Sequence, residues 1–91
     1  MAVAFGSFIR ERREQAGRTL TEVAAEVEIS IAYLSRIERD RENPPRDELI
    51  HRIADVLGLS ADETFAAARR LPPDLRARAG DVIALYRRFE S

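Results

Sequence analysis

Arginine is the residue type through which this chain could do most of its chemistry. All 15 basic residues are arginines, set against 16 aspartates and glutamates, and the net charge is −1. Each arginine carries a planar fork of N–H donors that matches both phosphate oxygens and the edge of a guanine base. The chain nevertheless lacks the basic excess of many nucleic-acid-binding proteins. The positions of the arginines must therefore decide what they bind.

Catalytic chemistry has little support in the composition. The absence of cysteine excludes a thiol nucleophile, a thiolate zinc site and a disulfide. His51 is the only histidine, lacks partners at metal-ligand spacing and is interpreted as a surface residue of a helix. The acid pairs at 47–48 and 62–63 complement helix dipoles in first turns, which is a sufficient structural role. We therefore expect no enzymatic activity, no metal and no cofactor.

Arg36, Arg39 and Arg41 gather in one short stretch of the chain. A cluster of this kind can contact phosphates and base edges. The same arginines could instead form surface ion pairs of small energetic value, and the partners would be acids at 38, 40 and 42. Both interpretations stay open from the sequence alone.

The spacing of apolar residues predicts an all-α fold with five or six helices and no strands. Five segments carry apolar positions at helical steps: 5–16, 20–27, 31–39, 47–57 and about 61–70. Capping residues mark helix starts and glycines mark helix ends. They are Thr19 with Glu22, Ser30, and Ser60 with Glu63, and then Gly17 and Gly58. A polar loop over 40–45, closed by two prolines, separates the third segment from the fourth.

The second and third segments have the pattern of a helix-turn-helix. A three-residue turn joins two short capped helices, and Ala24 lies where a small side chain lets them cross closely. Apolar residues occupy all five slots that should face the shared core: Val23, Val27, Ile29, Leu34 and Ile37.

At this point the sequence resembles a known family. The matching residues are Thr19-Leu20-Thr21-Glu22-Val23-Ala24, Ile29-Ser30-Ile31-Ala32-Tyr33-Leu34-Ser35-Arg36-Ile37-Glu38-Arg39, Asn43-Pro44, Leu57-Gly58-Leu59-Ser60 and Phe65. They are similar to the phage-repressor-like regulators of the xenobiotic-response-element family, over roughly residues 5 to 70. The resemblance implies a five-helix lambda-repressor-like DNA-binding domain over 1–70, whose third helix enters the major groove of double-stranded DNA.

Position by position, the resemblance implies groove-facing roles for six residues: Ser30, Ile31, Ala32, Tyr33, Ser35 and Arg36. Arg36 is the best candidate for reading a base, because it can donate two parallel hydrogen bonds to guanine. Phosphate contacts are expected from the start of the second helix, with its free N–H groups, and from residues beyond the third. These are Thr19, Thr21, Arg39, Arg41 and Asn43.

Acidic residues depart from this pattern. Glu28 stands where the family commonly has a glycine at positive φ, so either the turn is strained by about 1 kcal/mol or its backbone differs. Glu26, Glu28, Glu38 and Asp40 are expected near the DNA face, where they would repel phosphates and weaken operator affinity.

The segment 71–91 predicts an additional C-terminal helix. Its apolar stripe consists of Leu75, Ala79, Val82, Tyr86 and Phe89. The stripe could complete the core, or it could pair with a second copy in a homodimer that binds a pseudo-palindromic operator as a repressor. The alternative is a protein-interaction module, antitoxin-like or anti-regulator, that uses this helix to engage a protein partner. No signal peptide or membrane-spanning run is recognisable, so we expect a cytoplasmic protein.

Overall fold

The computed structural model describes residues 4–69, which form five helices and contain no strand. In chain order they are α1 Phe5–Gln15, α2 Leu20–Val27, α3 Ile31–Glu38, α4 Asp47–Leu57 and α5 Ala61–Ala67. The predicted all-α class is confirmed, and α2 and α4 have the predicted bounds. The predicted C-terminal helix, with Leu75, Ala79, Val82, Tyr86 and Phe89, lies outside the described residues.

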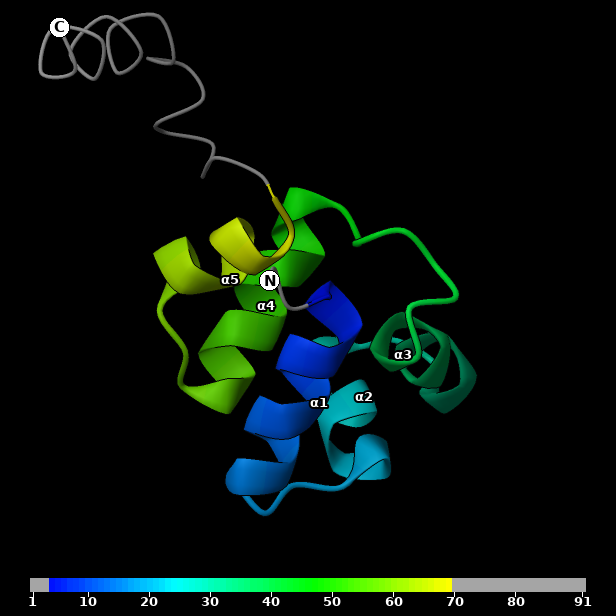
Figure 1. Ribbon diagram of the computed structural model, residues 1–91. Coiled ribbons are helices and arrows are strands. Elements are labelled where there is room, and N and C mark those ends of the chain that lie inside the picture. Colours follow the sequence, from blue (N-terminus) through cyan, green and yellow to red (C-terminus); the bar gives the residue numbers. More distant parts are fainter. Residues whose placement is uncertain (1–3, 70–91) are drawn as a thin grey trace, which may run out of the picture.

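The main helix contacts close a ring around one apolar core. α3 packs on α1 and α2, α2 packs on α4, α4 on α5, and α5 returns to α1. Figure 1 shows α3 at one edge of the bundle, on the far side of α1 from α5. Every helix contributes a completely buried side chain, including Ile9, Val23, Leu34, Ile53 and Phe65. Because only one side of α3 faces this core, its other side remains available.

Local capping explains where the helices begin. The Thr19 hydroxyl accepts a hydrogen bond from the Glu22 N–H at 3.1 Å, and Glu22 Oε1 accepts one from the Thr19 N–H at 3.2 Å, as predicted. These contacts with Thr19, with a smaller contribution from Arg18, lower the pKa of Glu22. Ser30 caps α3 by accepting from the Tyr33 N–H at 3.0 Å. At Ser60 the structure forms only the hydroxyl half of the predicted box, to the Glu63 N–H.

Three helices end slightly earlier than predicted. α1 and α3 each stop one residue short, at Gln15 and Glu38. α5 stops at Ala67 because Arg69 adopts a left-handed conformation with φ 58°, which turns the chain out of the helix. Gly17 and Gly58 have positive φ after α1 and α4, as expected for helix ends.

The backbone of the turn between α2 and α3 is strained at Glu28. This is the first of the two alternatives that the sequence left open there. Glu28 has φ 63° and ψ 44°, a left-handed conformation in which Cβ crowds the backbone. Arg52 of α4 supports the turn from the side, because its Nη1 donates to the Val27 carbonyl at 2.8 Å. The same Nη1 lies 3.6 Å from Glu28 Oε2.

Glu28→Gly is expected to stabilise the domain by about 0.5–1 kcal/mol, because glycine adopts this φ without strain. The greater entropy of glycine in the unfolded chain offsets part of the gain. The Arg52 contact that is lost is exposed and contributes little. Urea denaturation measures the change. Glu26→Gly is the matched control, since a glycine inside α2 should lower stability by about 1 kcal/mol. A Glu28→Gly variant as unstable as that control would show that the turn carries no strain.

Candidate nucleic-acid interface

The helical period divides the predicted base-contacting residues between the outer face and the two flanks of α3. Leu34 and Ile37 are buried, as predicted. On the outer side, Ser30, Ile31, Ala32 and Arg36 are exposed, whereas Tyr33 and Ser35 are half-buried on opposite flanks of the helix. Ile31 is 48% exposed and is the exposed large hydrophobic residue of the described part of the chain. The outer face therefore offers two apolar side chains, Ile31 and Ala32, and one arginine, Arg36.

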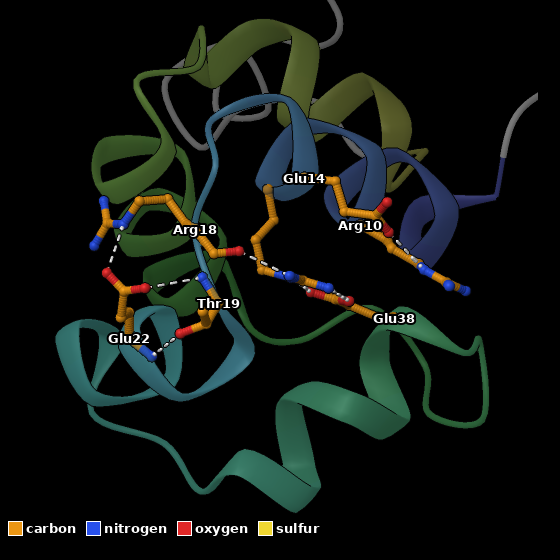
Figure 2. A network of polar contacts seen from close by, with 7 residues as sticks. Arg10, Glu14, Arg18, Thr19, Glu22 and Glu38 are labelled. Atoms are coloured by element: carbon orange, nitrogen blue, oxygen red, sulfur yellow. Dashed lines mark hydrogen bonds and ion pairs between the residues drawn. The ribbon is translucent and has the colours of Figure 1, made fainter.

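A buried ion pair fixes α3 against α1. Arg13 of α1 donates from Nε and Nη2 to the two carboxylate oxygens of Glu38, at 2.8 and 3.0 Å, and from Nη1 to the Arg18 carbonyl at 2.8 Å. Figure 2 labels Glu38 and Arg18, whose carboxylate and carbonyl oxygens accept these hydrogen bonds. The hydrogen bond to Glu38 raises the pKa of Arg13. Arg13 thereby ties three segments together: α1, the loop after it, and the end of α3.

The expectation that Glu38 lies near the DNA face is wrong. Its side chain is 4% exposed and faces α1. The helical period in fact turns Glu38 inward beside Leu34, where Arg13 neutralises its charge.

Asp40 has a structural contact that the sequence did not reveal. Its Oδ1 accepts a hydrogen bond from the Gly6 N–H at 2.9 Å, so it satisfies a free donor in the first turn of α1. The approach is possible because residue 6 has no side chain. A Cβ there would lie 2.3 Å from the Ile37 carbonyl oxygen.

The two remaining acids are exposed but paired. Glu26 forms a hydrogen-bonded ion pair with Arg18, and Glu28 lies near Arg52. Each of the four acids expected to repel DNA thus has a cation or an N–H group beside it. The repulsion expected from the sequence is correspondingly reduced.

Of the clustered arginines Arg36, Arg39 and Arg41, only some form ion pairs among residues 4–69. Arg36 Nε donates to Glu42 Oε1 at 2.9 Å, and its guanidinium carbon lies 5.8 Å from the centre of the Tyr33 ring. Within residues 4–69, Arg39 and Arg41 form no side-chain ion pair. Among residues 4–69, therefore, Arg36 is the one of these three arginines that forms an ion pair.

All five residues expected to contact phosphates are exposed, but their donors are not equally free. The N–H of Thr19 is bound by Glu22, as the predicted capping box requires, so it is not one of the free N–H groups at the start of α2. Thr21, Arg39, Arg41 and Asn43 are exposed at the start of α2 and in the segment after α3.

Two clefts flank α3, and arginines from other parts of the chain line them. The sequence did not reveal that Arg10, Arg46 and Arg52 lie there. The larger, about 240 Å³, separates Tyr33 from the start of α4 and is lined by Arg46 and Arg52. The smaller, about 130 Å³, lies between α3 and α1 and is lined by Arg10 and Arg39. No sequence pattern relates Arg10, Arg46 or Arg52 to α3, because they approach it only after the helices pack; Arg39 was already expected beside it.

His51 is exposed on α4, as predicted, and its ring forms a T-shaped contact with the Phe65 ring, with 4.9 Å between centroids. The described residues contain no group of three His, Asp or Glu side chains that could hold a metal ion. None of the helices in residues 4–69 has the length and apolarity needed to cross a bilayer.

These features define a helix-turn-helix domain of the DNA-binding class. α2 is capped, the turn after it is left-handed, and α3 packs on α1 and α2 with its other side exposed. The chain belongs to the helix-turn-helix domain family, whose model matches residues 4–68. The resemblance to phage-repressor-like regulators of the xenobiotic-response-element family is confirmed.

Curated relatives of this chain carry regulatory names. The uncharacterized HTH-type transcriptional regulator Rv0474 of Mycobacterium tuberculosis is 35% identical over 78 residues, which cover 86% of this chain and 55% of the relative. The transcriptional regulator ClgR of the same organism is 43% identical over 73 residues, covering 72% of this chain and 64% of ClgR. The chain therefore spans a little over half the length of these relatives.

Among solved structures, the biofilm regulator SinR in complex with DNA matches with a TM-score of 0.63 and 28% identity. The match covers 67% of this chain and 97% of the SinR chain. The shared part is therefore the helical domain.

Proposed function

We propose that this protein regulates transcription, without catalysis or a cofactor, by binding double-stranded DNA sequence-specifically with α3 in the major groove. The single observation that carries this proposal is the division of α3 into a fixed side and a free side. Glu38 and the apolar residues hold it against α1 and α2, while Arg36 and Ile31 stay exposed. The names of the relatives and the DNA in the SinR structure support the same function.

The chemistry of the free side suits base readout. Arg36 can donate two parallel hydrogen bonds to guanine O6 and N7, and Ile31 and Ala32 can contact a thymine methyl group. Ser30, Tyr33 and Ser35 supply hydroxyl groups around them. Specificity in this proposal depends mainly on Arg36, because it is the only charged group among the six proposed base contacts.

Phosphate contacts in this proposal come from both flanks of α3. A helix in the major groove has one DNA strand on each side. The two arginine-lined clefts lie on these two sides, so each can face the backbone of one strand. Arg39, Arg41, Asn43, Thr19 and Thr21 are the contacts proposed from the sequence, and they position the domain without reading bases.

The wider architecture is also part of the proposal. Residues 1–70 are the DNA-binding domain, and 71–91 form a helix whose stripe (Leu75, Ala79, Val82, Tyr86, Phe89) joins two copies. The dimer acts as a cytoplasmic repressor on a pseudo-palindromic operator, with recognition helices about 34 Å apart.

Arg36→Ala tests base readout. A preferred duplex is first selected from random DNA at defined salt, and affinities are then measured by fluorescence anisotropy on this duplex and on a scrambled one. Arg36→Ala should weaken binding to the preferred duplex about 10- to 100-fold, and binding to the scrambled duplex far less, because the lost hydrogen bonds reach a base.

Arg41→Ala is the matched control, since it also removes one exposed arginine. It should weaken binding to both duplexes alike and reduce the slope of log affinity against log salt by about one. Equal losses on both duplexes from Arg36→Ala would remove that residue from base readout. A wild-type protein that prefers no duplex would refute the proposed function itself.

A further inference from the structure

The contact between Arg36 and Glu42 leaves one end of the arginine open. Glu42 lies in the loop between α3 and α4, and its Oε1 accepts only from Nε of Arg36, at 2.9 Å. Tyr33, one turn earlier on α3, places its ring 5.8 Å from the guanidinium carbon. Within residues 4–69, the two terminal nitrogens, Nη1 and Nη2, make no hydrogen bond.

The open end is the one that a guanine needs. A guanidinium group has five N–H donors in a fixed plane, and the Nη1 and Nη2 groups can supply two parallel donors to O6 and N7. An unattached arginine samples many rotamers and loses this freedom on binding. A carboxylate that holds Nε limits the rotamers beforehand without covering the reading end.

We infer that Glu42 is a positioning residue for Arg36, which it holds, together with the Tyr33 ring, in an orientation that presents the Nη1–Nη2 end to a guanine. This inference rests on the proposed function. It reverses the usual interpretation of such a pair, in which an acid near the DNA merely competes with the phosphates for the arginine. Glu42 repels the backbone of every duplex, but it increases the preference for the duplex with the correct guanine.

The two interpretations differ in what Glu42→Ala does to discrimination. Two duplexes serve as probes: the selected duplex, and the same duplex with one guanine pair replaced. The pair to replace is the one whose replacement lowers the affinity of the wild-type protein but not that of Arg36→Ala. If Glu42 only repels phosphates, Glu42→Ala tightens binding to both duplexes by the same factor. If Glu42 positions Arg36, the ratio of the two affinities falls, by about 3- to 10-fold.

Glu42→Gln separates charge from geometry. Its amide oxygen can still accept from Arg36 Nε, while the negative charge is gone. We expect tighter binding to both duplexes, with the affinity ratio kept within about 2-fold of wild type. Glu26→Ala is the matched control, since Glu26 is also an exposed acid paired with an arginine, Arg18, and its removal should leave the ratio unchanged.

A cycle with Arg36→Ala completes the test. In that background the two duplexes bind alike, so Glu42→Ala can only change both affinities by one factor, which measures how strongly Glu42 repels phosphates. The inference is overturned if Glu42→Ala leaves the ratio unchanged in the wild-type background, or if Glu26→Ala lowers the ratio equally. Because both outcomes are measured against a wild-type preference, they are distinct from failure of the proposed function, in which the wild-type protein shows no preference.

Discussion

Glu38→Ala is expected to destabilise the domain by about 3 kcal/mol or more, the largest effect of any single substitution considered. Arg13 would keep its charge at a site where its side chain is only 12% exposed, and it would lose two of its three hydrogen bonds. Removing one partner of a buried ion pair typically costs about 3–5 kcal/mol, because the other charge remains without compensation. Chemical denaturation followed by circular dichroism measures the loss.

Two controls identify the cause. Glu14→Ala removes an exposed partner of Arg10 on the same helix and should change stability by less than about 1 kcal/mol. The double variant Arg13→Met with Glu38→Leu replaces both charges by apolar groups and should be clearly more stable than Glu38→Ala alone. If the double variant is the less stable of the two, the loss came from poor packing at 38 and not from the stranded charge.

Gly6→Ala should also destabilise the domain strongly, although alanine normally stabilises a helix relative to glycine. The new Cβ would lie 2.3 Å from the Ile37 carbonyl oxygen, and 2.7 Å from both the Glu38 carbonyl oxygen and Asp40 Oδ1. Two of these neighbours are backbone atoms, so α1 and the end of α3 must move apart. Overpacking of this kind costs about 1–3 kcal/mol, and we expect a value near the upper end, measured as a shift of the urea midpoint.

Gly17→Ala is the matched control for the close approach. Nothing lies within 4 Å of a Cβ at that position, but φ is +69°, so the cost should be only the backbone strain of about 1 kcal/mol. Gly6→Ala should also lower affinity for the preferred duplex, because it displaces α3 from its support. A Gly6→Ala protein more stable than wild type would mean that α1 does not pack this closely on α3.

The helices and their caps could be predicted well because their causes are local. The bounds of α2 and α4 agree with the predicted ones, and Thr19 and Ser30 cap N–H groups three residues away. Apolar spacing also identified Leu34 and Ile37 as the inner side of α3. A pattern with a period of a few residues needs no knowledge of what packs against it.

The support of α3 could not be predicted. Arg13 and Glu38 are 25 residues apart, Gly6 and Asp40 are 34 apart, and Arg52 reaches the Val27 carbonyl across 25 residues. None of these pairs has a spacing that marks it in the sequence. Glu38 and Asp40 therefore looked like acids that would repel DNA, when their carboxylates in fact hold α1.

The sequence by itself determined an all-α helix-turn-helix chain and the side of α3 that carries Arg36, because the helical period alone orders these features. Tertiary structure alone decided which charges remain free on that side. Charges act through space, and a carboxylate is neutralised by whichever cation folding brings to it, however distant in the chain. In the folded domain Glu38 pairs with Arg13 and Glu42 pairs with Arg36. Arg39 and Arg41 form no ion pair among residues 4–69.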